Sequence, residues 1–317
     1  MIYKVGGVLV DVSVVIESIV SLFIMILVGV YARRKNIITD EINKGLVDIL
    51  IQIALPFMII SSFLHTYDST IKANVIKTAY FSLGAYILMA VISSLLLKPI
   101  KNDKRTILHF ANVFVNTGYV GFPILNSMYG PEGVVYGSIF NMLFVLFIWT
   151  YGIVLFKGRL KAEEIKQELK KVFLNPSILA VCAGLVILSF DLKLPSAIIF
   201  ASRGMGNLTG PLSMIIIGGI LSKVKIKKYL RDWTIYYGVA IKLVIIPMII
   251  YLASLLVGSS SIVINTVIIM TALPASAMTS IFAESFDKEK EYAAFFVSAT
   301  TLLSLFTVIL FIRYVLQ

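Results

Sequence analysis

Long runs of apolar residues recur along the whole chain, and short charged loops separate them. A helix needs about 20 apolar residues to cross a bilayer, so each run predicts one membrane-spanning helix. The pattern therefore predicts an all-α polytopic membrane protein. We expect ten spans, near residues 11–32, 45–65, 76–98, 106–128, 133–156, 172–190, 203–222, 233–257, 261–284 and 291–314.

Glycine and proline interrupt two of these runs, at 116–123 (NTGYVGFP) and at 271–276 (TALPAS). Glycine is a poor helix former and proline cannot donate to the preceding turn, so both helices should open there. Lipid offers no hydrogen-bond partner, so an opened helix persists at membrane depth only inside protein or beside a wet cavity. Paired breaks in corresponding positions of two halves are typical of the substrate site of a secondary transporter.

Pro123 is suited to begin the half-helix after the first break, and Pro274 repeats the arrangement in the second. The start of a helix offers free N–H groups and the positive end of the dipole, which favour an anion. Two such ends directed at one point would bind a carboxylate through backbone dipoles, without a fixed cation. The candidate substrate-binding residues are Asn112, Asn116, Thr117, Gly118, Gly121, Pro123, Asn141, Thr271, Pro274, Ala275 and Ser276.

Some of these features also have a simpler structural interpretation. An ordinary kink would explain Pro123 alone, although the polar residues upstream of it favour a functional break. Asn141 fits a hydrogen bond between helices and a contact with substrate equally well. Lys242 lies well inside a span, where ionisable residues are functional candidates, but its stem could snorkel to the cytoplasmic side. We assign Lys242 a structural or gating role, together with Pro56 and Pro211.

The positions of the charges predict the topology. Only 14% of the residues are charged, against about 25% in soluble domains. The formal net charge is +11, but lysine and arginine gather in alternate loops, as the positive-inside rule predicts for a membrane protein and not for one that binds nucleic acid. We expect a multi-pass protein of the cell membrane with both termini outside and the connector from Lys157 to Lys171 inside.

The spans divide into two halves of five, over residues 1–157 and 172–317, joined by the connector at 158–171. Because five is odd, the second half enters the membrane in the opposite orientation, which predicts an inverted repeat. Prolines occupy matching spans in support of it: Pro56 and Pro211 in spans two and seven, and Pro123 and Pro274 in spans four and nine.

The sequence carries no catalytic constellation. It contains one cysteine, Cys182, and two histidines, His65 and His109, with no His-Glu-x-x-His motif and no glycine-rich loop ending in Lys-Ser or Lys-Thr. We therefore expect no enzyme, no catalytic residue, no metal site and no cofactor.

Several motifs resemble the auxin efflux carrier family. They are the run at 116–123, YGPEG at 129–133, Asn141 followed by WTYG at 149–152, LTGPLSM at 208–214 and ALP at 272–274. The resemblance covers essentially the whole chain. The chain looks like a prokaryotic member of that family, because it has a short connector where plant members have a long cytosolic loop.

The resemblance implies ten helices in two inverted five-helix repeats, with broken helices four and nine crossed as in NhaA-type antiporters and bile-acid symporters. It also implies a homodimer, an elevator-type mechanism and an organic-anion substrate. Asn116 matches the asparagine that helps bind substrate in plant relatives, and Pro123 and Pro274 match the crossover prolines. Prokaryotic relatives are described as malate or malonate permeases, so a small dicarboxylate is the expected substrate.

The expected function is thus a carrier of small organic anions, for uptake or efflux. The alternative is a sodium- or proton-coupled symporter or antiporter of the same fold with a different substrate. That alternative would require carboxylates near the crossing, and the sequence places none there convincingly.

Overall fold

The chain forms an all-helical, multi-span membrane protein with a short hairpin at its start. The structure is a computed structural model that describes residues 2–5, 8–65, 67, 70–158, 170, 172–222, 229–256 and 261–314. The hairpin, which the sequence analysis did not predict, pairs β1 (Ile2–Val5) with β2 (Val8–Asp11) antiparallel, with Ile2 opposite Asp11. Of the connector at 158–171, residues 159–169 and 171 lie outside the described residues.

The helices of the first part of the chain follow the predicted apolar runs. A helix of 24 residues runs without a break from Asp40 to Phe63, and another of 41 residues runs from Thr117 to Lys157 with a bend at Gly130. In order, the elements are α1 (Val12–Arg34), α2 (Asp40–Ile49), η1 (Leu50–Ala54), α3 (Leu55–Phe63), α4 (Thr70–Leu96), α5 (Asn102–Val113), η2 (Thr117–Gly121), α6 (Phe122–Phe147), η3 (Ile148–Gly152) and α7 (Ile153–Lys157).

Over its described residues, the second part of the chain also consists of α-helices, with one π-helical segment. Its elements are α9 (Pro176–Ser189), α10 (Ser196–Gly206), α11 (Thr209–Leu221), α12 (Trp233–Ala240), η5 (Ile241–Ile245), α13 (Ile246–Leu255), α14 (Ile262–Ala272), α15 (Met278–Ser285) and α16 (Lys290–Tyr314). Within the described ranges, six helices are long and apolar enough to cross a membrane, and α9 and α14 are shorter apolar helices.

Three prolines lie just after turns of π-helix. The segments η1, η2 and η5 end two residues before Pro56, Pro123 and Pro247. Proline lacks an N–H, and its ring clashes with the carbonyl four residues earlier. A wider turn moves that carbonyl aside, so the helix continues. At Pro56 the helix therefore continues through a π-helical segment without a break. Pro211, in contrast, follows a short interruption between α10 and α11 at Asn207–Leu208.

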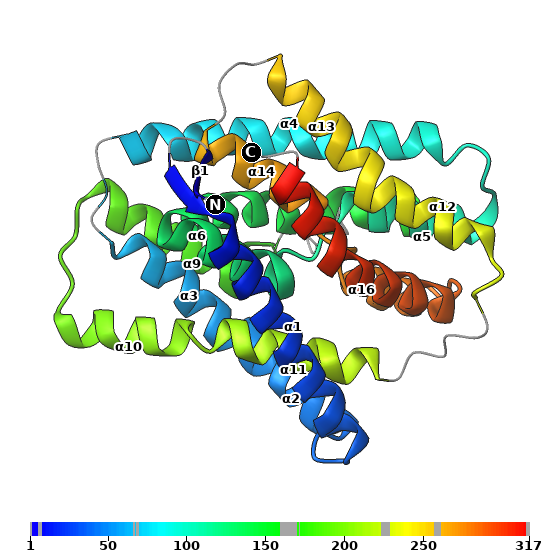
Figure 1. Ribbon diagram of the computed structural model, residues 1–317, viewed down its shortest axis with the longest axis horizontal. Coiled ribbons are helices and arrows are strands. Elements are labelled where there is room, and N and C mark those ends of the chain that lie inside the picture. Colours follow the sequence, from blue (N-terminus) through cyan, green and yellow to red (C-terminus); the bar gives the residue numbers. More distant parts are fainter. Residues whose placement is uncertain are drawn as a thin grey trace.

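The helices pack in two groups (Figure 1). One contains α1, α2, α3, α9, α10 and α11, and the other contains α4 to α7 and α12 to α16. Within the first group, α1 and α11 touch backbone to backbone: a Cβ added at Gly218 would lie 2.2 Å from the carbonyl oxygen of Ile26, and one at Gly29 would lie 2.3 Å from that of Ile215. Small residues that let backbones approach closely are typical of helix interfaces in membranes.

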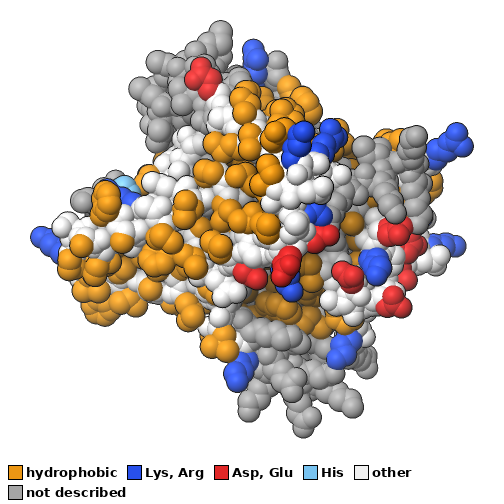
Figure 2. Space-filling model, turned by 90° about the horizontal axis from the view of Figure 1, so that it is seen from below, with side chains coloured by type: hydrophobic (Ala, Val, Ile, Leu, Met, Phe, Trp, Pro, Cys, Tyr) orange, Lys and Arg blue, Asp and Glu red, His pale blue; other side chains and the backbone are white. Residues whose placement is uncertain are grey.

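The surface carries many large apolar side chains, as a lipid-facing protein requires. Leu256, Phe200, Tyr80 and Phe190 are each at least 72% exposed. Figure 2 shows hydrophobic side chains over much of the left half of one face, with acidic and basic side chains gathered mainly in its right half. That separation is the one expected of a protein with apolar belts and charged loops.

Ion pairs connect the charged ends of the second group. Lys104 in the first turn of α5 donates to Asp232, which precedes α12, over 2.7 Å, and Lys288 donates to Asp103 over the same distance. Partial burial raises the pKa of Asp232, but hydrogen bonds from Lys104 and Thr234 outweigh it and hold that pKa below its usual value. The same hydrogen bond raises the pKa of Lys104.

Replacing Asp232 by asparagine should lower the free energy of unfolding by about 1 kcal/mol near neutral pH, the scale of a partly exposed charge pair. Asparagine can still cap α12 through its side-chain oxygen, so the change isolates the charge. Because the pKa of Asp232 is lowered in the fold, its contribution is present above the ordinary carboxyl pKa of about 4 and is lost as pH falls through the folded pKa. In detergent at pH 7, Asp232→Asn should therefore have a lower melting temperature than the wild type. Equal stability there would contradict the assignment.

Candidate functional site

Two interrupted helices meet and satisfy each other's backbone. Helix α5 ends at Val113 and the next helix begins at Thr117, while α14 ends at Ala272 and α15 begins at Met278. Between them Val115 and Ala275 form an isolated antiparallel bridge. The N–H of Asn116 donates to the carbonyl oxygen of Pro274, and the N–H of Ser276 donates to that of Phe114, each over 2.9 Å. Each break thus supplies the partners that hydrocarbon could not give the other.

The first break lies upstream of the position that the sequence predicts. Asn116 caps the restarted helix, because its Oδ1 accepts from the N–H of Tyr119 over 3.2 Å, and the helix then runs through Pro123. The prediction that Pro123 begins the half-helix is therefore wrong. The π turn of η2 absorbs the proline, and Gly118 and Gly121 lie inside helix.

Gly121 has a packing role in the crossing. A Cβ added there would lie 2.8 Å from Leu273 Cδ1 and 2.9 Å from Met270 Sδ, so the missing side chain lets η2 approach α14. At Gly118 the nearest atom to an added Cβ is Leu55 Cδ2 at 3.5 Å, which is an ordinary contact.

The second break is held by α16 and by its own serine. The N–H of Ala275 donates to Thr300 Oγ1 over 3.3 Å, and Ser276 Oγ accepts from the N–H of Met278 over 3.2 Å. Pro274 lies in the break itself, where its carbonyl accepts from Asn116. The hydroxyl of Thr271 donates to the carbonyl oxygen of Ile268 within α14, so it serves its own helix.

Asn141 takes part in a hydrogen bond between helical segments. Thr117 Oγ1 donates to Asn141 Oδ1 over 2.6 Å, and both side chains are buried. Of the two interpretations of Asn141, the structure shows the contact between helices. This bond attaches the first turn of η2 to the later part of α6.

A cavity of about 280 Å³ lies against the two restarted helices and between the two helix groups. Asn116 and Tyr119 line it from η2, and Ala277 and Ser280 line it from the start of α15. Its polar lining is completed by Ser298 and Thr301 of α16. The remaining lining is apolar, from Val47, Ile217, Ile220, Leu221, Ile281, Ala294 and Val297.

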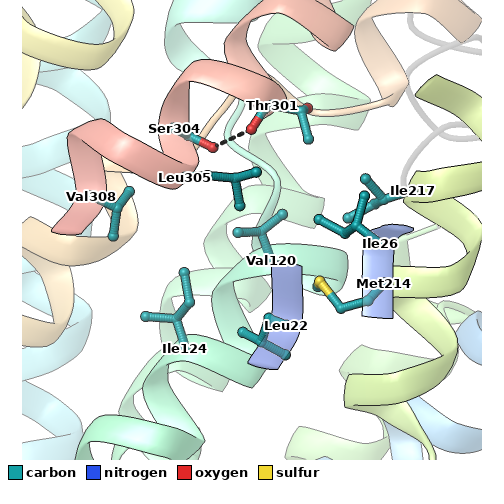
Figure 3. A pocket seen from close by; sticks show the side chains of 10 residues that line it. All are labelled: Leu22, Ile26, Val120, Ile124, Met214, Ile217, Thr301, Ser304, Leu305 and Val308. Atoms are coloured by element: carbon teal, nitrogen blue, oxygen red, sulfur yellow. Dashed lines mark hydrogen bonds between the residues drawn. The ribbon is translucent and has the colours of Figure 1, made fainter. Parts of the chain in front are cut away.

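A second, smaller void of about 20 Å³ lies at the same boundary between the helix groups (Figure 3). Leu22, Ile26, Met214 and Ile217 face it from α1 and α11, and the side chains opposite belong to η2, α6 and α16. It shares Ile217 and Thr301 with the larger cavity. A gap of this size holds about one water molecule.

Lys242 lies next to the crossing and is completely buried. Its Nζ donates over 3.1 Å to the carbonyl oxygen of Asn112, in the last turn of α5. In an unbroken helix that carbonyl would accept from the N–H of Asn116, which here donates to Pro274. Lys242 therefore does not snorkel, because the interrupted helix leaves a free carbonyl to which its amino group donates. A lysine amino group therefore lies next to the crossing, although it does not line the cavity.

Comparison with known proteins identifies the chain. The profile of a family described as membrane transport protein matches residues 14–312, almost the entire length. The chain belongs to this family. This membrane transport protein is therefore a multi-pass transporter and not an enzyme, and its resemblance to the auxin efflux carriers is confirmed.

Two archaeal relatives align with nearly all of this membrane transport protein. An uncharacterized transporter of Methanocaldococcus jannaschii is 24% identical over 304 residues, which cover 93% of this chain and 96% of the relative. An uncharacterized transporter of Methanothermobacter thermautotrophicus is 22% identical over 295 residues, or 91% of this chain and 94% of the relative.

Of the predicted substrate-binding residues, Asn116 lines the cavity of this membrane transport protein and the others do not. Sequence analysis missed Tyr119, Ser280, Ser298 and Thr301. A signal existed for two of them: Ser298 and Thr301 are three residues apart in a largely apolar helix, which places them on one face.

Proposed function

We propose that this membrane transport protein carries small organic anions by alternating access around the crossing of its two interrupted helices. The observation that carries the proposal is that the first turns of both restarted helices line one cavity. Each helix start carries about half a positive charge, so two of them together complement roughly one carboxylate.

The side chains of the cavity suit such a ligand. Because Asn116 Oδ1 is engaged as a cap, its amide NH₂ is the part left to donate to a carboxylate. The hydroxyls of Ser280 and Ser298 supply further donors, whereas that of Thr301 donates to the carbonyl oxygen of Val297. The apolar lining suits a short hydrocarbon part. At about 280 Å³ the cavity falls just below the usual range for drug-sized ligands, which favours a small molecule such as a dicarboxylate.

The proposed motion is of elevator type. Both voids lie between the helix group of α1, α3 and α11 and the group that contains the crossing. In this proposal the second group slides against the first and carries the anion with it. Each chain consists of two inverted five-helix repeats, and two chains form a homodimer in the cell membrane. With both termini outside, the cavity is open to the cytoplasmic half, since α15 and the ends of α2 and α11 that line it lead to basic loops.

Counterflow in proteoliposomes tests the proposal. Vesicles that contain the purified protein would be loaded with unlabelled carboxylate and assayed for exchange with radiolabelled malonate, malate or an aromatic carboxylate. We expect exchange of at least one small carboxylate and no exchange of a labelled cationic amino acid. Protein-free vesicles give the background. Failure of a folded protein to exchange any carboxylate would overturn the proposal.

A further inference from the structure

Lys242 is buried without a carboxylate partner. Among the described residues it is the lysine with no exposed surface, and none of the ion pairs found there includes it. Its one hydrogen-bond acceptor found there is the carbonyl oxygen of Asn112. Burying an ammonium that lacks a counter-charge is costly, and such a group tends to give up its proton.

The end of α5 offsets only part of that cost. The last turn of a helix carries a partial negative charge, about half an elementary charge, so the Asn112 carbonyl favours the ammonium without neutralising it. The proton on Lys242 is therefore poised to respond to any further negative charge that comes near the crossing.

The elements around Lys242 supply few titratable groups. η5 packs on α5, α12, α13, α14 and α16. On α5, His109 is linked to the same asparagine: its Nδ1 lies 2.9 Å from Ser93 Oγ, to which Asn112 Nδ2 donates over 3.1 Å. The ring of Tyr251 on α13 packs against Phe311. The other groups on these elements have partners of their own or lie at the helix ends: Asp103, Lys104, Arg105, Tyr236, Tyr237, Lys290, Glu291, Tyr292, Arg313 and Tyr314.

We propose that Lys242 is the proton-binding residue of this transporter and that one proton crosses the membrane with each carboxylate. The inference rests on the proposed function. When the anion occupies the cavity beside the crossing, its negative charge favours the ammonium form of Lys242, and by reciprocity the ammonium favours the anion. The amine takes up one proton from the side where the anion enters and releases it on the side where the anion leaves, so a monoanion and its proton move without net charge.

Gradient-driven uptake in proteoliposomes tests this inference, with the carboxylate that the wild type exchanges as the probe. An outside one pH unit more acidic should drive about tenfold accumulation at one proton per anion. A pH-sensitive dye inside the vesicles should report acidification during uptake. Between about pH 7 and 9, where carboxylates stay ionised, the affinity of the wild type for the anion should rise as pH falls.

Two substitutions separate a proton carrier from a fixed charge. Lys242→Arg keeps a permanent cation and Lys242→Met removes it, and both should reduce the accumulation ratio from about tenfold to onefold and abolish the dye signal. Lys77→Met, at an exposed lysine on α4, is the matched control and should accumulate the anion like the wild type.

The outcomes are distinct. Proton-driven accumulation by Lys242→Arg, or a wild type that exchanges the carboxylate with an affinity independent of pH, would overturn the role of Lys242 and leave the proposed function standing. A wild type that exchanges no carboxylate would overturn both.

Discussion

Asn116→Ala should lower the affinity of transport about tenfold or more. The side chain lines the cavity and caps the restarted helix, so its amide NH₂ is held where an anion would bind. Hydrogen bonds to charged groups contribute about 1.5–3 kcal/mol, which corresponds to roughly a tenfold to hundredfold loss on removal. The measurement is the concentration dependence of counterflow in proteoliposomes.

A comparison of variants separates ligand binding from capping. Asn116→Asp keeps an oxygen that can accept from Tyr119 and suits a helix start, but it places a negative charge in the cavity. It should retain thermal stability and lose transport at least as fully as alanine. Asn126→Ala changes an exposed asparagine on the same helix and should leave transport unchanged. Normal counterflow by Asn116→Asp would show that Asn116 serves the helix and not the anion.

Gly218→Ala should destabilise the first helix group strongly. The new Cβ would meet the carbonyl oxygen of Ile26 at 2.2 Å and the Cα of Gly29 at 2.8 Å, which are backbone atoms that cannot move aside as a side chain does. Overpacking of this kind typically costs about 1–3 kcal/mol, and we expect the upper part of that range. The apparent melting temperature in detergent should fall by roughly 5 °C or more.

Gly210→Ala is the matched control for that change. It lies on the same helix, and an added Cβ there has no atom within 4 Å. Alanine should be neutral or slightly stabilising at this position, because glycine is the poorer helix former. If both variants melted at the same temperature, Gly218 would not be required for close contact between α1 and α11.

The sequence predicted the existence of the helices better than the details of their breaks. Apolar runs of about 20 residues have one stable conformation in lipid, so spans such as 70–96 and 290–314 follow from composition. The position of the first break could not be read in the same way. A π turn absorbed Pro123, and the helix opened instead where Phe114–Asn116 could pair with the second break.

The polar residues near the crossing could also be predicted only in part. Asn116 was found because it precedes the glycine and proline of its motif, whereas Ser298 and Thr301 belong to a helix without any interruption. Lys242 was noticed as a charge inside a span, but its partner is a backbone carbonyl on α5, more than a hundred residues away. A carbonyl left free by a distant break has no signature in the amino-acid sequence. The hairpin of β1 and β2 was missed although Gly6-Gly7 between two apolar runs is a turn signal.

Disulfide formation between residues 115 and 275 tests the crossing of the two breaks most directly. Val115 and Ala275 face each other as a non-hydrogen-bonded pair, because the hydrogen bonds of the bridge join the residues on either side of them. In such a pair the Cα atoms lie about 4.5 Å apart, within reach of a disulfide. The double variant Val115→Cys, Ala275→Cys would be made in a Cys182→Ser background, since Cys182 is an exposed free thiol. A protease site would be inserted in the connector at 158–171. After mild oxidation and cleavage, the two halves should stay joined on a non-reducing gel and separate on reduction, whereas each single-cysteine protein should fall into two fragments. Halves that separate without reductant, in a double variant that still folds, would contradict the meeting of the two helices on which the proposed transport depends.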